Sequence, residues 1–168
     1  KEDNDSFPAE TADKSFYFAD NDKLLFASEQ DGWNHLYSIA ASGGAATLLT
    51  PGSFEVEDVT LANDRHSVIF SSNQDDVDRR HLWRVDLQGG KPQALTKGET
   101  MEWSPVESGT GGQVVCLRSS ATVPAMPFHL GAKGREMIAR QALPADFPSS
   151  QLVTPKQVIF KSEDGLDI

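Results

Sequence analysis

Cysteine is almost absent from this sequence, because Cys116 is the only one among 168 residues. No disulfide can therefore form within the chain. Cys116 lies in the apolar run of residues 114–117, where no neighbour in the sequence would activate its sulfur as a nucleophile. We expect a buried structural thiol at this position, and one cysteine does not decide the redox compartment.

Long hydrophobic runs and positive charge are also scarce. No stretch approaches the ~20 apolar residues that a bilayer-spanning helix needs, although the hydrophobic content of 38% suffices for a core. The 15 Lys and Arg residues are outnumbered by 25 Asp and Glu residues, so the formal net charge is −10. This balance argues against nucleic acid and membrane partners, because nucleic acids and anionic membranes attract basic surfaces.

Helical periodicity is missing, and a repeat stands in its place. His81-Leu82-Trp83 follows His35-Leu36-Tyr37 by 46 positions (81 − 35). A Gly-Gly turn and a Leu-Thr pair recur with the same spacing, and the run that contains Cys116 begins a weaker third copy. Repeats of this length are typical of β-propellers, in which each blade is a four-stranded sheet.

Each copy predicts four short strands separated by turn residues. The predicted strands are residues 15–19, 23–28, 35–40 and 45–50; 55–61, 67–72, 81–87 and 92–96; and 102–106, 113–119, 127–130 and 136–140. The sequence therefore predicts an all-β fold, a partial β-propeller of about three four-stranded antiparallel blades. Within the first blade, Asp31-Gly32 predicts a two-residue type I′ hairpin turn.

The chain divides into three predicted parts. Residues 1–14 are a polar N-terminal segment or the remnant of a preceding blade, and residues 15–143 form the partial propeller, with blades at about 15–52, 53–98 and 99–143. Residues 144–168 form a linker rich in Pro and Ser that ends in a strand, a turn and a second strand. Three blades cannot close a ring, since propellers use roughly 4–8, so we expect a fragment of a larger protein.

Four segments carry a resemblance to a known family. They are Ser28-Glu29-Gln30-Asp31-Gly32-Trp33-Asn34-His35-Leu36-Tyr37, Leu49-Thr50-Pro51-Gly52-Ser53-Phe54-Glu55-Val56, Phe70-Ser71-Ser72-Asn73 and Phe160-Lys161-Ser162-Glu163-Asp164-Gly165-Leu166. The sequence from about residue 15 to residue 168 resembles the propeller of the prolyl oligopeptidase superfamily, in its dipeptidyl peptidase IV branch. The last segment is similar to the family's first strand of an α/β-hydrolase domain.

The resemblance implies a parent serine peptidase that removes short units from peptide N-termini, often after proline. The propeller of that family restricts access to a cavity above the hydrolase. The implied partners are the missing α/β-hydrolase domain and the peptide substrates of the parent. The family's nucleophile lies in a Gly-x-Ser-x-Gly elbow, which does not occur in this sequence. Its paired glutamates belong to an earlier blade, so no catalytic, cofactor-binding or metal residue is assigned, no cofactor is expected, and the chain alone should be inactive.

Several residue groups have a structural and a functional interpretation, and the structural one is favoured for each. The histidines are assigned to packing or hydrogen bonding rather than to metal, the acidic run to a solvated loop rather than to calcium, the Gly-rich stretch to a strand connection rather than to a phosphate loop, and the tryptophans to packing. The acids near the second blade's inner strand are candidates for the channel, with their facing left open. The histidines are His35, His66, His81 and His129, and the acidic run holds Asp75, Asp76 and Asp78. The Gly-rich stretch is Gly109, Thr110, Gly111 and Gly112, and the tryptophans are Trp33, Trp83 and Trp103. The acids near the inner strand are Glu55, Glu57 and Asp58.

Two functions follow as hypotheses. The favoured one is a non-catalytic propeller segment that gates or shapes substrate access in a dipeptidyl-peptidase-like serine hydrolase. The alternative is a non-enzymatic propeller similar to TolB that binds another protein. A periplasmic or secreted location is slightly favoured over a cytoplasmic one. Because the end blades lack neighbours, we also predict a homo-oligomer through exposed apolar residues at 16–18 and 114–116.

Overall fold

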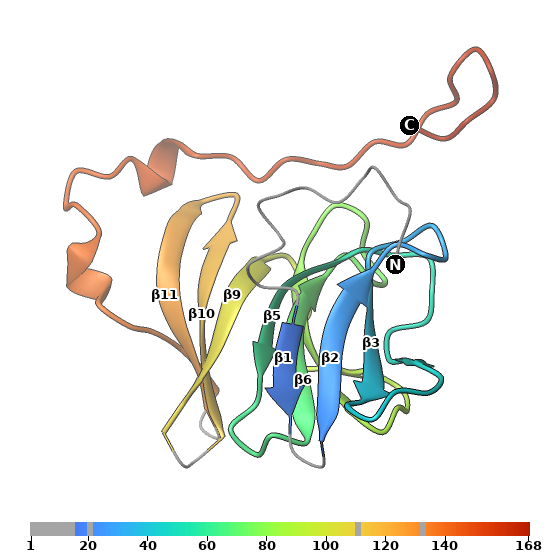
Figure 1. Cartoon of the computed structure of the whole chain (residues 1–168). Coiled ribbons are helices and arrows are strands. Elements are labelled where there is room, and N and C mark those ends of the chain that lie inside the picture. Colours follow the sequence, from blue (N-terminus) through green and yellow to red (C-terminus); the bar gives the residue numbers. More distant parts are fainter. Residues whose placement is uncertain (1–15, 20–21, 110–111, 132–133) are drawn as a thin grey trace.

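The computed structural model describes residues 16–19, 22–109, 112–131 and 134–168, which form three four-stranded antiparallel sheets in chain order (Figure 1). The strands are β1 (Phe16–Ala19), β2 (Lys23–Ser28), β3 (His35–Ala40), β4 (Thr47–Leu48), β5 (Val56–Leu61), β6 (Ser67–Ser72), β7 (His81–Asp86), β8 (Gln93–Ala94), β9 (Met101–Ser108), β10 (Gln113–Ser120), β11 (Val123–Gly131) and β12 (Gly134–Met137). Each strand pairs with the next strand of its own sheet. The structure confirms the prediction of an all-β fold with three four-stranded blades.

The sheets repeat one another in register. Phe26 pairs with Tyr37 in the first sheet and Phe70 pairs with Trp83 in the second. The fourth strands are shorter than predicted, since β4 and β8 contain two residues each. The third strand of the last blade is longer than predicted, because β11 begins at Val123 rather than at Pro127.

Strand β6 is apolar on both faces because each face packs against a neighbouring sheet. All six of its residues are buried. Val68 and Phe70 join a core with the first sheet, whereas Ile69 joins a second core with the third sheet. A central sheet covered on both faces needs apolar side chains at successive positions, which is why its sequence does not alternate with polar residues. The core members are Ala19, Leu25, Leu36, Leu49, Phe54, Val56, Val68, Phe70, Trp83, Val85 and Leu87 in the first cluster, and Ala62, Ile69, Leu82, Val114 and Cys116 in the second.

The third sheet corrects one expectation about its outer face. Val114 and Cys116 are buried at 4% and 2% exposure and pack toward the second sheet, while Val115 between them is half-buried. Successive side chains of a strand point to opposite faces, so the run at 114–116 cannot lie on the outer face as a whole. The side chains at 16–18 lie outside the described residues. The expectation of a buried thiol at Cys116 is confirmed.

The loop between β2 and β3 corrects the prediction of a two-residue turn. Six residues, 29–34, separate the strands, and the Gly32 N–H donates to the Glu29 carbonyl at 2.9 Å. Gly32 has a φ of +91°, but Asp31 is not among the residues with positive φ, so the turn is not type I′. The Asp31 carboxylate instead accepts a hydrogen bond from the Trp33 N–H at 3.4 Å and contacts the His35 ring at 2.8 Å, which holds a wider loop.

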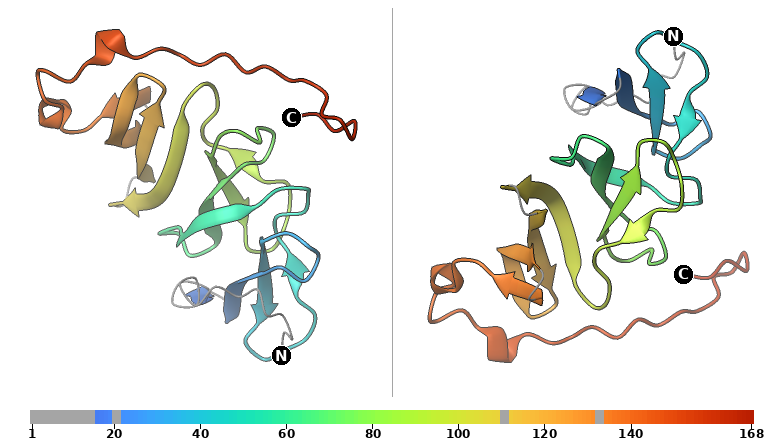
Figure 2. Two further views of the ribbon diagram at one scale, coloured as in Figure 1. Left: turned by 90° about the horizontal axis from the view of Figure 1, so that it is seen from above. Right: turned by 90° about the horizontal axis from the view of Figure 1, so that it is seen from below.

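The C-terminal segment leaves the third sheet and runs along the outside of the molecule (Figures 1 and 2). It contains two short 3₁₀ turns, η2 (Arg140–Ala142) and η3 (Ser149–Gln151), and ends in a hairpin in which Phe160 and Ile168 exchange two backbone hydrogen bonds. β12 spans Gly134–Met137, whereas the sequence predicts a strand at residues 136–140. In the described ranges, no helix has the length and apolar character needed to cross a membrane.

Candidate functional site

The first strands of the second and third sheets, β5 and β9, lie side by side and are distorted at the same point. The Thr60 hydroxyl donates to the Pro105 carbonyl at 2.6 Å. The pairing of β5 with β6 shifts in register between Val56 and Val59. The pairing of β9 with β10 shifts in register between Trp103 and Val106. Such β-bulges re-aim side chains and are frequent near binding sites.

The two bulges bring Asp58 and Ser104 together. These residues lie 46 positions apart in the sequence (104 − 58), so they are equivalent in the repeat. Ser104 has a φ of +49°, which is uncommon for a residue with a side chain, and its hydroxyl donates to Asp58 Oδ1 at 3.4 Å. The other carboxylate oxygen of Asp58 accepts from the Ser71 hydroxyl at 3.2 Å.

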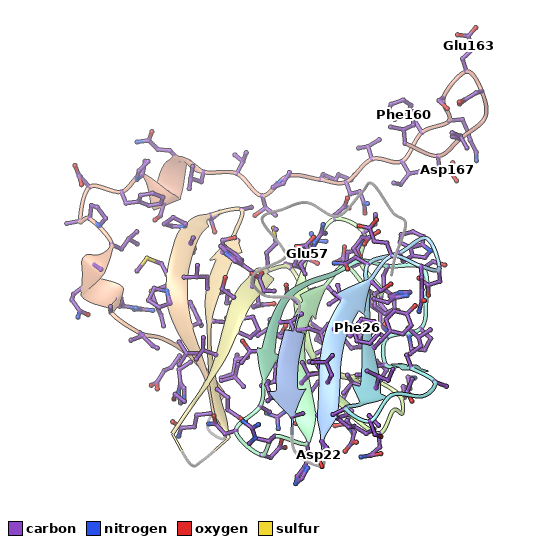
Figure 3. All side chains as sticks on the ribbon, viewed as in Figure 1. Asp22, Phe26, Glu57, Phe160, Glu163 and Asp167 are labelled. Atoms are coloured by element: carbon purple, nitrogen blue, oxygen red, sulfur yellow. The ribbon has the colours of Figure 1, made fainter. Side chains whose placement is uncertain are left out.

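The remaining acids of this region have different roles. Glu57 is exposed at the upper end of the sheets, as labelled in Figure 3, and its carboxylate bonds to Arg80 Nε at 2.7 Å. Glu55 precedes β5 and accepts the Asn34 N–H of the first sheet at 2.7 Å. Of the three predicted channel candidates, only Glu57 and Asp58 therefore belong to the inner strand. Exposed carboxylates beside a hydroxyl can accept hydrogen bonds from amines or amides.

The histidines at equivalent repeat positions both bond to carboxylates. His35 Nδ1 lies 2.8 Å from Asp31 Oδ2, and His81 Nδ1 lies 3.0 Å from Glu102 Oε2. Both rings are buried. The prediction that they serve hydrogen bonding is confirmed.

Glu102 is a buried residue that sequence reasoning missed. It stands at the repeat position of Val56, since Glu102 N donates to Arg80 O and Val56 N donates to Asn34 O, both at 2.8 Å. Glu102 is 0% exposed. A carboxylate in place of an apolar residue within an otherwise regular repeat is the signal that could have found it.

Three side chains surround the Glu102 carboxylate. The Thr100 hydroxyl donates to it at 2.6 Å, and His81 contacts its second oxygen. Arg118 Nε lies 3.1 Å from Oε1 as an ion pair without the alignment of a hydrogen bond, and the same guanidinium covers the Phe128 ring at 4.6 Å. His81 belongs to the second sheet and Arg118 to the third, so the cluster joins two blades.

The other predicted candidates are dispersed. Asp76 and Asp78 are engaged in the loop between β6 and β7, where Asp76 pairs with Arg79 at 3.1 Å and accepts the Asp78 N–H at 3.1 Å. His66 is exposed and His129 is half-buried. Among the described residues, no three His, Cys, Asp or Glu side chains are grouped closely enough to hold a metal ion. Of the Gly-rich connection, residues 110 and 111 lie outside the described residues, and the Gly109 carbonyl accepts from Asn63 Nδ2 at 2.7 Å.

The three tryptophans differ in environment. Trp83 is 6% exposed and belongs to the core between the first and second sheets, as predicted. Trp103 is half-buried on β9, where it pairs with Leu117. Trp33 is 36% exposed in the loop between β2 and β3 and does not belong to either core.

Comparison with models of protein families shows which family the chain belongs to. The model of the dipeptidyl peptidase IV (DPP IV) N-terminal region matches residues 1–125. The chain belongs to this family. Curated relatives include a probable dipeptidyl peptidase 4 of Emericella nidulans, 32% identical over 100 residues that cover 58% of this chain and 13% of the relative. A probable dipeptidyl peptidase 4 of Aspergillus flavus is 29% identical over 119 residues, which cover 70% of this chain and 15% of the relative.

Solved structures share the fold of this DPP IV N-terminal region at low sequence identity. Dipeptidyl peptidase 4 of Porphyromonas gingivalis matches with a TM-score of 0.68 and 19% identity over 92% of this chain and 22% of that chain. A puromycin-hydrolyzing peptidase of Mycobacterium tuberculosis matches with a TM-score of 0.69 and 17% identity over 91% and 24%. A TolB-type protein of Agrobacterium tumefaciens matches with a TM-score of 0.58 and 21% identity over 73% and 48%. The matched residues cover only 13% and 15% of the length of the two curated relatives.

Proposed function

We propose that this chain is a non-catalytic propeller segment of a longer dipeptidyl-peptidase-like serine hydrolase, in which it shapes access of peptide substrates to the hydrolase domain. Membership of the DPP IV N-terminal region family supports the proposal. The observation that carries it is the C-terminal hairpin, whose sequence resembles the family's first hydrolase strand.

The hairpin exposes an unusual amount of apolar surface. Three large apolar side chains of the hairpin and two just before it are 59–66% exposed: Phe160, Leu166 and Ile168, and Val158 and Ile159. Phe160 lies well away from the three sheets (Figure 3). Contiguous apolar patches are rare on soluble monomers and mark contact surfaces. The proposed α/β-hydrolase domain would cover this hairpin and extend it into a sheet.

The inner strands supply the surface that faces the proposed substrate cavity. Asp58, Glu57 and Ser104 place two carboxylates and a hydroxyl on adjacent strands, and they contain no assembled nucleophile and base. A site of this kind can contact a peptide's amine or amide groups and cannot cleave it. The segment's role is therefore exclusion and positioning.

The test compares this chain with a longer version that continues past Ile168 in the natural reading frame. We expect the 168-residue chain to leave Gly-Pro and Ala-Pro reporter substrates intact, and the longer protein to hydrolyse them with inhibition by a serine-directed phosphonate. In the longer protein, Phe160→Ser should lower activity and the melting temperature together, whereas Val77→Ser, at a 76% exposed loop position, should change neither. An unrelated or absent downstream domain would contradict the proposal.

The TolB-like alternative rests on one observation. The TolB-type structure matches with a TM-score of 0.58, and this chain covers 48% of it, about twice the share that it covers of the peptidase structures. An interaction propeller would bind a protein partner without a hydrolase domain. The natural sequence past Ile168 distinguishes the two functions, because only the first function requires a hydrolase domain there.

A further inference from the structure

The segment of residues 152–160, here named the strap, runs at the upper end of the sheets in Figure 1 and beside them in the view from above in Figure 2, on its way to the C-terminal hairpin. All nine of its residues are exposed. In the part of the chain that the structure describes, residues 152–159 make no backbone–backbone hydrogen bond, and only Phe160 is paired within the hairpin. The strap's own backbone therefore does nothing to hold it in position.

Among the residues that the structure describes, one side-chain hydrogen bond joins the strap to the body of the molecule. Gln157 Nε2 donates to Asp78 Oδ2 at 2.5 Å, across 79 positions of sequence. Asp78 lies in the loop between β6 and β7, and this loop is braced. Arg79 pairs with Glu99 at 2.8 Å and with Asp76 at 3.1 Å. The acceptor Asp78 thus lies in a loop that ion pairs hold in place, whereas the donor Gln157 lies on a segment without backbone hydrogen bonds.

A cavity of about 490 Å³ lies under this contact. Its walls are the β6–β7 loop, the start of β9 at Met101 with Glu99 before it, the end of β10 with the following Ala121, and strap residues 154–157. The cavity size falls in the range of small-ligand sites. The strap forms one wall of it, so any movement of the strap opens the cavity and displaces the hairpin.

We propose that the strap is a lid held closed by the Gln157–Asp78 hydrogen bond, which acts as a latch. Closed, the strap forms one wall of the cavity, and the hairpin projects beyond the sheets (Figure 1). Open, the latch frees the strap between η3 and the hairpin, because no other hydrogen bond retains residues 152–159 within the described residues. In the longer hydrolase proposed above, release would widen the gap between propeller and hydrolase. That consequence rests on the proposed function, whereas the latch itself does not.

Cross-linking on this chain tests whether the latch closes. Cys116 is buried and is the only native cysteine, so introduced thiols can be modified selectively. A short bismaleimide should join Ala121→Cys to Thr154→Cys, two exposed residues that both line the cavity, about tenfold faster than it joins Ala121→Cys to Glu163→Cys, since Glu163 lies at the far tip of the hairpin (Figure 3). Both pairs leave Asp78 and Gln157 in place. Equal rates for the two pairs would mean that the strap moves freely and would overturn the proposal.

Proteolysis tests whether the same contact holds the lid. Trypsin can cleave after Lys156, which lies on the exposed strap beside Gln157. Asp78→Ala and Asp78→Val should each raise this cleavage rate about fivefold, because the hydrogen bond from Gln157 to the carboxylate is lost while the cleaved sequence is unchanged. The control Val77→Ala, in the same loop, should not. An unchanged rate in both latch variants would overturn the proposal, and neither measurement depends on peptidase activity.

Discussion

At the scale of single residues, the repeat reproduces individual hydrogen bonds as well as strand positions. Thr50 Oγ1 accepts the Leu36 N–H at 2.9 Å, and Thr96 Oγ1 accepts the Leu82 N–H at 2.8 Å. Both threonines are almost fully buried. A buried backbone N–H without a partner is costly, which explains why a Leu-Thr pair recurs where the fourth strand is too short to supply a carbonyl.

Gly32 offers a test of backbone strain alone. Its φ is +91°, and a Cβ added there would meet no atom within 4 Å. Gly32→Ala should therefore lower the free energy of unfolding by about 1 kcal/mol through conformation and not through a clash. Chemical denaturation measures this change. The control is Gln30→Ala in the same exposed turn, and a Gly32→Ala protein as stable as this control would show that the loop adapts.

Asp64 links stability to pH. Burial raises the pKa of its carboxyl, but bonds from the His66 and Ser67 N–H groups and the Ser67 hydroxyl, with the charge of Arg84, outweigh burial and hold the pKa below its ordinary value of 3.8. A lowered pKa in the folded state contributes stability that is present above 3.8 and disappears as the pH falls through the folded value. Asp64→Asn should thus reduce the melting temperature at pH 7 more than at pH 3. The control is Asp75→Asn, at an exposed loop position.

At the scale of elements, Glu102 decides how the second and third blades join. Removing one member of a buried charged group leaves its partners unpaired, which typically costs about 3–5 kcal/mol. Glu102→Ala should therefore lower the free energy of unfolding by roughly 3 kcal/mol, because the change affects His81 and Arg118 together. Equilibrium unfolding in urea measures it.

The control for this prediction is Glu99→Ala. The Glu99 side chain is 82% exposed and pairs with Arg79, so its loss should cost at most about 1 kcal/mol. Similar losses for the two variants would contradict the assignment of Glu102 as a joint between blades. A smaller loss in Glu102→Val than in Glu102→Ala would agree with the equivalence of this position to Val56.

At the scale of the whole molecule, the end sheets decide association. The second sheet is covered on both faces, whereas the first and third sheets each have one neighbour among the described residues. We predict that the isolated chain forms a homodimer or larger assembly through the uncovered end faces and the apolar hairpin. Light scattering at tens of micromolar measures the mass. A monodisperse monomer would contradict this prediction and would show that the chain's own segments cover these surfaces.

The sequence by itself determined the strand order, the repeat and the family, because a four-stranded blade is built from local hairpins whose periodicity and turns appear directly in the residues. It did not determine the loop around Asp31, the buried Glu102 joint, the paired bulges at Asp58 and Ser104, or the latch between Asp78 and Gln157. Each of these except the loop joins segments from different blades or joins a blade to the C-terminal segment. Such contacts depend on how complete sheets pack, and the loop depends on where a carboxylate finds its partners, so only the tertiary structure decided them.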